Sequence, residues 1–595
     1  MRLKQCIVKH NCFDYPIHNV SGLVQARNDD YQFVELTGNN SSAQIVCDGS
    51  WNPQQGLDLR FLCKEVPLDD QLRLALKPDL REIWQGFRPR GTLDLIRVDL
   101  ALPIGNQACE VRVDATMSKP QAGVEPNFIS INPVWFPYEI SRLTGQIKIG
   151  DGQILLTDIA GQHGRSWLAC HGDGHYANDS WSVNLQDLLA GSLRVDDDLM
   201  AAVPRSLAPP LRQLSFDGLL NVQGTITLAG QRQPNNELVE TEYRNKIDDT
   251  SNIVPTRNSL AWDLRFDMTQ AKMKVGFPLE NVFGSVQLTG QFDGNQVACR
   301  GELAIDSLTI HDAQITKVSG PIWLDGERSA AGIFANQKSN NSPAANFAPV
   351  PNPTDQPRSL TGTMHSGIVR FDALMNSDAE GEFYLQTTLA DGDLKQFCRE
   401  FAPQLSEVSG RSYAALRLTG NYLGVPSYRG DGTVQLRDGK IYQLPVMLSL
   451  LKILRIGETD RTAFDSSNVD FKIAGEDIEL NRIEMLGEPI SLLGNGKIDF
   501  NRNIDLNFYS VMGRNRINIP LLTEMYRASS QQVLWINVDG TLDKPQTHRH
   551  VLPQINDSLK QLFQPPEQHN MVKNWGNIPP NRWAHSNSSV SPLRR

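Results

Sequence analysis

The chain has 595 residues, several times the length of a usual domain, and its formal net charge is −10 at pH 7. Its lysines and arginines are scattered, so the charge pattern argues against a nucleic-acid partner. No run of about 20 apolar residues occurs, which is the length that a membrane-spanning helix needs. The eight cysteines form no CxxC pair, so we expect small buried hydrophobic residues rather than a disulfide framework or a zinc ribbon.

Three stretches resemble one another and indicate a repeat protein: Cys12–Gly49, Trp135–Gly172 and Gly276–Gly301. The first two align without a gap, because glycines and one cysteine keep the same spacing in both. We interpret these glycines as hairpin turns. The unit is about 125 residues long, which is far longer than one coil of a short solenoid repeat, so each unit must contain several strands.

Short helices are expected at Asp70–Ala75 and Asp197–Val203, where acidic residues are typical of a helix N-cap and first turn. Alternating apolar residues, clearest at 216–228, predict strands with one apolar and one polar face. Turn sequences between such runs are typical of antiparallel hairpins. They are Gly150-Asp151-Gly152, Phe292-Asp293-Gly294 and Arg437-Asp438-Gly439.

Three more helices are expected in the C-terminal region, which otherwise has strand patterns. Leu394–Phe401 is short, Leu444–Ile456 is almost entirely apolar, and Leu552–Phe563 is amphipathic. At 13 residues, Leu444–Ile456 is too short to span a bilayer. We expect it to cap the end of the sheet, with contact to a membrane surface as the alternative.

Stretches rich in Asn, Pro, Ser and Gln divide the chain, because such compositions do not form a packed core. The first repeat begins almost at Met1, so we expect its start to be truncated and a preceding segment to be missing from this sequence. The predicted divisions are repeat 1 at 1–130, repeat 2 at 131–275 with a disordered insertion at 231–258, a partial repeat 3 at 276–335, a disordered linker at 336–358, a C-terminal domain at 359–563 and a disordered tail at 564–595.

A family resemblance rests on the order of five segments in the C-terminal region. They are Gly430–Ile441, with its G-x-G strand start, the Leu444-Pro445 helix start, the strands of Phe464–Gly496, Ile519-Pro520, and Val538–Pro545, which reads V-D-G-T-L-D-K-P. This order resembles the AsmA-like C-terminal domain over roughly residues 359–550, and the upstream repeats resemble the long β-groove portion of the same proteins.

The resemblance implies a non-enzymatic bacterial envelope protein of the periplasm, anchored in the inner membrane and active in outer-membrane biogenesis. It implies a groove that carries phospholipids, with their acyl chains and the inner and outer membrane surfaces as partners and with no cofactor. The sequence departs from the family in having no N-terminal membrane helix, so we expect the anchor to lie in the missing segment. The Leu552–Phe563 helix is a candidate for docking an envelope protein.

The expected fold class is mainly β: an elongated, twisted antiparallel sheet of tandem repeats that forms a hydrophobic groove, with a few short capping helices. A sheet with one apolar face must cover that face or offer it to another apolar molecule. The predicted helices are too few to cover about 20 strands, which would form a sheet on the order of 90–100 Å long.

The residues expected to line the groove are apolar residues at alternating strand positions. Which set of alternate residues faces the groove depends on the strand register, since a slip by one residue exchanges the two faces. They are Leu95, Ile147, Ile149, Cys170, Leu220, Val222, Ile226, Leu303, Ile305, Val434, Leu436, Phe471, Ile473, Ile498, Leu506 and Ile536. The expected end-cap or membrane-contact residues are Leu444, Val446, Met447, Leu450, Leu451 and Leu454.

No catalytic or metal-binding residue is predicted. Cys47, Cys170 and Cys299 occupy one repeat position and are interpreted as packing residues rather than reactive thiols. His163, Cys170, His171 and His175 carry zinc-binding groups, but strand alternation would place Cys170 and His171 on opposite faces. The acidic pair at 69–70 and the acidic triplet at 196–198 are explained more simply by helix caps than by acid–base chemistry.

Two other functions remain open. One is a structural or adhesive array of β-repeats without lipid, in which a second layer would close the sheet. The other is a glycan-active enzyme, but no pair of acidic residues lies among aromatic residues as such a cleft would need.

Overall fold

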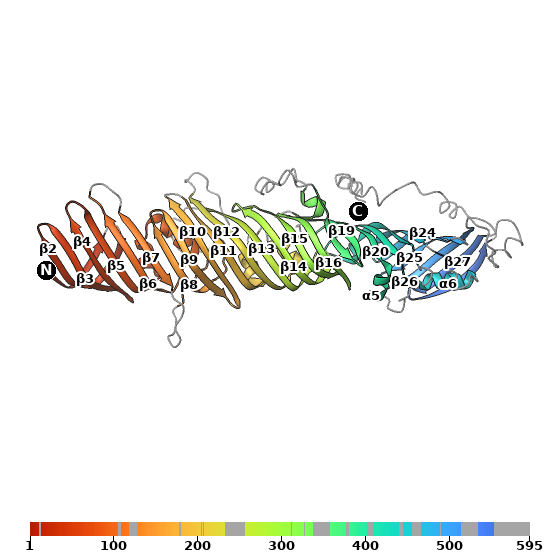
Figure 1. Cartoon of the computed structure of the whole chain (residues 1–595), viewed down its shortest axis with the longest axis horizontal. Coiled ribbons are helices and arrows are strands. Elements are labelled where there is room, and N and C mark those ends of the chain that lie inside the picture. Colours follow the sequence, from red (N-terminus) through yellow and green to blue (C-terminus); the bar gives the residue numbers. More distant parts are fainter. Residues whose placement is uncertain are drawn as a thin grey trace, which may run out of the picture. The chain divides into compact units, whose positions relative to one another are not determined.

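The structure is a computed structural model of the whole chain (Figure 1). It describes residues 1–10, 13–104, 109–117, 128–177, 180–203, 205, 208–232, 256–275, 277–310, 312–325, 328–336, 357–376, 380–401, 408–439, 444–454, 464, 466–487, 490–512 and 533–552. The predicted tail at 564–595, and most of the predicted insertion and linker, lie outside these ranges.

The fold is mainly β, as predicted, and its described strands form one antiparallel sheet of 28 strands, more than the 20 or so expected. The first part of the sheet contains β1 (Arg2–His10), β2 (Phe13–Arg27), β3 (Asp30–Asn40), β4 (Ala43–Asn52), β5 (Gly56–Pro67), β6 (Thr92–Leu102), β7 (Glu110–Met117), β8 (Ser141–Gly150), β9 (Gln153–His163), β10 (Ser166–Ala177), β11 (Ser180–Arg194), β12 (Asp217–Arg232), β13 (Thr256–Lys274), β14 (Pro278–Phe292), β15 (Val297–Ile310) and β16 (Ala313–Asp325). Each of these strands pairs with its neighbours in the sequence.

The remaining strands are β17 (Arg328–Ala331), β18 (Leu360–Met364), β19 (Gly367–Asn376), β20 (Phe383–Asp393), β21 (Arg411–Gly420), β22 (Arg429–Arg437), β23 (Ser466–Ala474), β24 (Asp477–Leu486), β25 (Ile490–Asp499), β26 (Asn503–Met512), β27 (Val533–Thr541) and β28 (Lys544–Leu552). From β21 to β28 every strand again pairs antiparallel with the next strand in sequence. The V-D-G-T-L-D-K-P segment forms the tight hairpin between β27 and β28, where Thr541 faces Lys544.

The described helices are short: α1 (Asp70–Ala75), α2 (Pro78–Phe87), α3 (Asp197–Ala202), α4 (Ala208–Leu214), α5 (Leu394–Phe401) and α6 (Pro445–Leu454), with 3-10 turns η2 (Gly332–Asn336) and η5 (Val425–Ser427). The predicted helix caps are confirmed, because Asp69 Oδ1 accepts from Leu72 N and Asp196 Oδ1 accepts from Leu199 N, each at 3.0 Å. Helices α2 and α4 were not predicted.

The repeat glycines lie inside strands, so their interpretation as hairpin turns is wrong. Gly22, Gly38 and Gly49 lie within β2, β3 and β4. A Cβ atom on Gly38 would lie 2.5 Å from Ile17 Cγ2, and one on Gly161 would lie 2.6 Å from Ile140 Cγ2. At Gly38 and Gly161, the side chain of a nearby isoleucine therefore fills the space that a Cβ atom would need.

The predicted turns at 151–152 and 293–294 are confirmed, because they join β8 to β9 and β14 to β15. The turn at Asp438-Gly439 follows β22, but the chain then forms α6 before it returns as β23, which pairs with β22. The expected helix Leu552–Phe563 lies outside the described residues, apart from Leu552, which ends β28.

One strand position of the sheet is filled by two separate segments. β16 pairs with β17 and also with β18, and the residues between them include η2 and the predicted linker. The linker is therefore an insertion within one strand position. Asp372 of β19 bonds to both sides of the interruption: its carboxylate accepts from Ile333 N at 2.9 Å and from Ser359 Oγ at 2.9 Å.

The chain folds into two compact units. Unit 1 comprises residues 1–362 and 372–383, and unit 2 comprises residues 363–371 and 384–595. Each unit has buried apolar clusters of its own.

Candidate functional site

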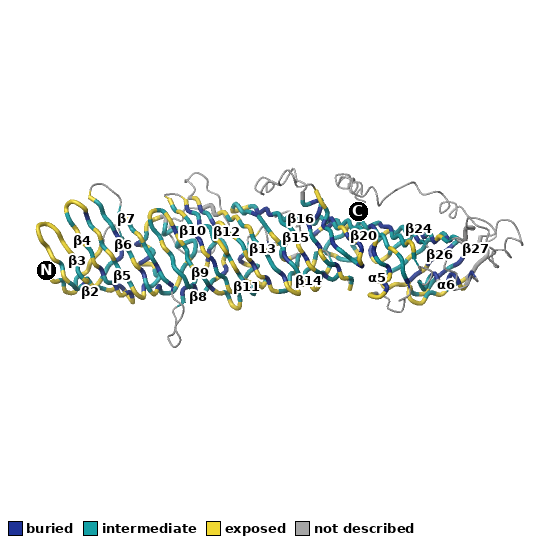
Figure 2. The backbone as a smooth tube through the Cα atoms, in the orientation of Figure 1, coloured by how far each residue is buried: buried dark blue, intermediate teal, exposed yellow. Residues whose placement is uncertain are grey.

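One face of the unit 1 sheet is apolar along its described strands, and we call it the apolar face. In β12, Leu220, Val222 and Leu228 are buried, whereas Leu219 on the other face is 43% exposed. The apolar face continues across neighbouring strands, because apolar residues are paired there: Val222 with Phe266, Phe266 with Val286, and Val286 with Leu303. Figure 2 shows the resulting alternation of buried or intermediate residues with exposed ones along the strands.

The structure places most of the predicted unit 1 residues on this face. They are Ile147, Ile149, Cys170, Leu220, Val222, Ile226, Leu303 and Ile305. Leu95 is the exception. It faces Lys64 on one side and Thr116 on the other, while its neighbour Ile96 faces Cys63 on the apolar face.

The reason for the different position of Leu95 is a backbone irregularity in the neighbouring strand. Glu65 has a φ of 54°, which places it in the left-handed region. Cys63 and Val66 therefore both face the apolar side although they are three residues apart, and their partners Ile96 and Leu93 do the same. Such a bulge shifts the alternation, and period two alone does not predict it.

Helices α1 and α2 cover part of the apolar face. Leu72 and Ala75 of α1 and Trp84 of α2 pack with residues of β2 and β4 to β8 in one cluster. Ile83 and Phe87 of α2 pack in a second cluster. The other members of the second cluster are Trp135, Ile154, Leu156, Tyr176, Trp181, Val183, Leu185, Ile226, Leu228 and Leu260.

The α2 residues were missed by the sequence prediction, although a signal was present. Pro78 stands at the first turn of the helix, where proline is favoured. Leu80, Ile83, Trp84 and Phe87 follow with the spacing of an amphipathic helix. The sequence therefore contained both a start signal and an apolar stripe for a helix that packs on the sheet.

Further along unit 1 the apolar side chains are only partly covered. On β13 to β16 the central residues of the face are of intermediate exposure rather than buried. They are Leu264, Phe266, Val286, Leu288, Leu303 and Ile322. Among the described residues, this part of the face is an apolar surface that is only partly covered.

In unit 2 the corresponding face is filled by α6. The predicted groove residues Val434, Leu436, Phe471, Ile473, Ile498, Leu506 and Ile536 lie on one face of β22 to β27. Leu450, Leu451 and Leu454 of α6 are 0% exposed and share a core cluster with Leu506 and Ile536. Met447 belongs to the same cluster, and Leu444 and Val446 pack against it. The described part of α6 is therefore a core helix of this unit.

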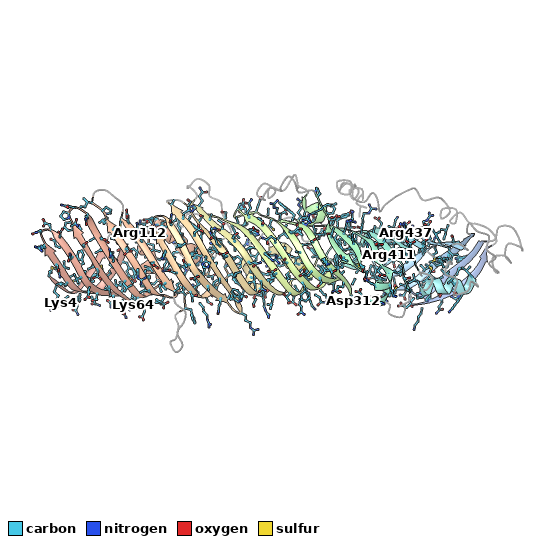
Figure 3. The ribbon with its side chains drawn as sticks, in the orientation of Figure 1. Lys4, Lys64, Arg112, Asp312, Arg411 and Arg437 are labelled. Atoms are coloured by element: carbon cyan, nitrogen blue, oxygen red, sulfur yellow. The ribbon has the colours of Figure 1, made fainter. Side chains whose placement is uncertain are left out.

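The opposite, polar face of unit 1 is held by hydrogen bonds across neighbouring strands. Gln146 Nε2 donates to Asp114 Oδ1 and Gln186 Nε2 donates to Asp173 Oδ1, both at 2.6 Å. Gln287 donates to Asp263 in the same way. Charged residues such as Lys4 and Lys64 lie along an edge of the sheet (Figure 3). The two faces thus differ strongly in polarity.

The buried thiols of the repeats are poorly suited to reaction. Burial raises the pKa of Cys47 to about 12, of Cys170 to about 11 and of Cys299 to about 12. The thiolate is the nucleophilic and metal-binding form, so these three side chains act as apolar packing groups near neutral pH.

The histidines considered for zinc do not converge with Cys170. His171 lies on the other face beside Asp158, with His171 Nδ1 accepting from Asp158 N at 3.3 Å. His163 stacks on Tyr138 with ring centroids 3.8 Å apart, and His175 Nδ1 lies 3.1 Å from Ser182 Oγ. Within the described ranges no group of three or more His, Cys, Asp or Glu side chains is arranged to hold a metal ion.

Among the described helices, none has the length and apolar character to cross a membrane. Comparison of the sequence with models of known protein families and with curated proteins gives no match.

Proposed function

We propose that this protein is a non-enzymatic lipid carrier whose apolar face holds the acyl chains of phospholipids. The observation that carries the proposal is the partly exposed apolar surface of β13 to β16, where Leu264, Phe266 and Leu288 remain accessible. An apolar surface of this kind on a sheet marks an interaction site. The AsmA-like motif order supports the same function and, with it, a place in a bacterial envelope between an inner and an outer membrane.

The physical driving force is the removal of methylene groups from water. Each buried methylene contributes about 0.8 kcal/mol, so a chain of about 16 carbons gains on the order of 10 kcal/mol if it is fully covered. A continuous face of aliphatic and aromatic side chains lets the chain change position without a polar barrier. Headgroups remain in water beside the charged edges, so no catalytic residue is needed.

The two units differ in how their apolar faces are covered, and we propose different roles for them. In unit 1 part of the apolar face is open, whereas in unit 2 α6 occupies it with fully buried leucines. We therefore assign lipid binding to unit 1 and a closing, structural role to α6. A structural array without lipid, the alternative hypothesis, would require a closed layer over β13 to β16 as well.

The test is to purify the full chain from a bacterial host and to analyse its organic extract by mass spectrometry. We expect co-purified phospholipid at a stoichiometric level. Phe266→Asp places a charge on the partly exposed part of the apolar face and should lower the bound lipid at least tenfold. Ala261→Asp, on the exposed polar face of the same strand, is the matched control and should retain it. A lipid-free wild-type protein, or equal lipid in both variants, would refute the proposal.

A further inference from the structure

Three turns at one end of the unit 2 strands carry an exposed apolar residue. Leu423, in the turn between β21 and β22, is 78% exposed. Phe500, between β25 and β26, is 50% exposed, and Leu542, between β27 and β28, is 40% exposed. The antiparallel register from β21 to β28 places these turns at the same end of the strands. We call Leu423, Phe500 and Leu542 the tip residues.

Exposed hairpin turns are normally polar, because glycine, proline, asparagine and aspartate suit their backbones. The unit 1 turns at 28–29, 53–55 and 151–152 follow this rule. One exposed apolar residue on a surface is ordinary. Here, however, three of the four turns at this end of β21 to β28 have one, and only Gly475-Glu476 does not. This concentration favours contact with an apolar medium rather than with water.

The backbones of these turns are held by internal hydrogen bonds. Leu423 N donates to Asn421 Oδ1 at 3.0 Å, and Leu542 N donates to Arg502 O of the neighbouring turn at 2.9 Å. Arg502 N donates to Asp499 O at 3.0 Å, which closes the turn between β25 and β26. Peptide groups with internal partners need no water, so these turns are suited to the interfacial layer of a bilayer.

The spacing and charge of this edge fit a flat, electrically neutral surface. From the first tip to the last there are six strand spacings, or about 30 Å at roughly 4.8 Å each. Such a row is too long for one small-molecule pocket. The turns and the strand residues that flank them carry three basic and four acidic side chains, so an anionic surface offers no advantage. They are Arg429, Arg502, Lys544, Glu476, Asp477, Asp499 and Asp543.

We propose that the tip residues insert into the surface of a zwitterionic phospholipid bilayer and thereby dock unit 2 on it. Leucine and phenylalanine side chains are stabilised when they leave water for the boundary of the acyl region. The satisfied turn backbones and the nearly balanced charges allow this contact without an anionic headgroup. Docking does not depend on lipid carriage, because it concerns turns of unit 2 and not the apolar face of β13 to β16.

The test is co-sedimentation of the full-length protein with sucrose-loaded vesicles of phosphatidylcholine, with and without phosphatidylglycerol. We expect wild-type protein to bind both kinds of vesicle with affinities within about twofold and with little dependence on salt. The variant Leu423→Ser/Phe500→Ser/Leu542→Ser should bind about a hundredfold more weakly or worse, since each apolar side chain contributes roughly a tenfold factor. Urea unfolding checks that the variant keeps the wild-type fold.

Leu155→Ser/Leu189→Ser/Leu219→Ser is the matched control. It removes three leucines that are 47%, 45% and 43% exposed on the polar face of unit 1, and it should bind vesicles like wild type. Equal loss in both triple variants, or full binding by the tip variant, would overturn the inference. So would wild-type protein that binds no vesicles, or that binds only those with phosphatidylglycerol and is released by salt.

Two further measurements separate this inference from its alternatives. Sedimentation velocity without vesicles detects a second copy of the chain as the occupant: an oligomer that the tip variant lacks would overturn docking on a bilayer. The tip variant should still co-purify with phospholipid. Lipid-free wild-type protein that docks on vesicles would refute lipid carriage and support docking. The wild-type measurements need no variant, so they hold even if a triple variant folds poorly.

Discussion

The hydroxyl of Tyr138 is hydrogen-bonded to the side chain of Ser166, whereas the equivalent tyrosine of the first repeat has no such partner. Tyr15 is 7% exposed, and its hydroxyl is buried without a hydrogen bond in the described structure. Ala43 occupies the position that corresponds to Ser166 in the gap-free alignment of the two repeats. The tyrosine hydroxyl at this repeat position therefore has a hydrogen-bond partner in the second repeat and none among the described residues in the first.

This difference predicts opposite effects of the same substitution. Tyr138→Phe should lower the free energy of unfolding by about 1 kcal/mol, because the hydrogen bond between Tyr138 and Ser166 is lost, although Ser166 Oγ still donates to Ser192 O. Tyr15→Phe should leave stability unchanged or raise it, because it removes a buried hydroxyl that has no partner. Urea unfolding of the two variants under one set of conditions measures both changes, and an equal loss in both would contradict the assignment of Ala43.

The glycines of the apolar face predict a second contrast. Gly161→Ala adds a methyl group that would lie 2.6 Å from Ile140 Cγ2 and 2.9 Å from Leu143 Cδ2. Overpacking of this kind costs about 1–3 kcal/mol. Gly86→Ala, in α2, meets no atom within 4 Å and should stabilise the protein by about 0.5–1 kcal/mol through helix propensity. Thermal unfolding checks both, and the hypothesis fails if Gly161→Ala is tolerated as well as Gly86→Ala.

Helix α6 predicts a third contrast, between a buried and an exposed leucine. Leu451 is 0% exposed, so Leu451→Ala should cost about 2–5 kcal/mol through lost burial and the cavity that remains. Leu74 of α1 is 55% exposed, and Leu74→Ala should change stability by less than about 1 kcal/mol. If α6 instead left the sheet to contact a membrane, Leu451→Ala would be nearly neutral in solution.

Asp372, which bonds to both sides of the insertion, predicts that the free energy of unfolding depends on pH. Burial raises the pKa of Asp372 above its ordinary value of 3.8, although Ile333 N–H and Ser359 Oγ donate to it. A raised pKa in the folded state means that its contribution is fully present below about pH 4 and is lost as the pH rises through the folded pKa. The difference in unfolding free energy between wild type and Asp372→Asn should therefore fall between about pH 3 and pH 7.

Asp499 provides a control of opposite sign. Hydrogen bonds from Asn503 lower the pKa of this exposed carboxyl group, so its contribution is present at neutral pH and is lost as the pH falls. The difference between wild type and Asp499→Asn should rise from about pH 3 to pH 7. Parallel urea titrations at several pH values compare the two variants, and changes of the same sign would refute this account.

The sequence predicted those parts of the fold that depend on local chemistry. Asp69 and Asp196 were interpreted as helix caps because their side chains can satisfy first-turn N–H groups, and Asp151-Gly152 as a turn because its backbone requires positive φ, which the structure shows at 52° and 75°. The antiparallel sheet followed from period two. These features are decided within a few residues of chain.

What the sequence could not predict depends on contacts between strands. The role of Gly161 is set by Ile140, which lies just before β8, and the face of Leu95 is set by the positive φ of Glu65. The unpartnered indole N–H of Trp135 could not be foreseen either, because the lack of a hydrogen-bond partner among the described residues is visible only in three dimensions.

The pairing of each strand with its neighbour in sequence also bears on how the chain reaches its fold. Contacts between adjacent hairpins have short sequence separation, so the loop-closure entropy of each step is small. Native structure can thus grow from the N-terminus, hairpin by hairpin, as successive segments leave the ribosome. This order is interrupted where β17 and β18 both pair with β16. Because β18 lies beyond the insertion in the sequence, the pairing of β16 is completed only after that later segment has been made. We expect the slowest step of assembly there, with Asp372 joining the two sides last.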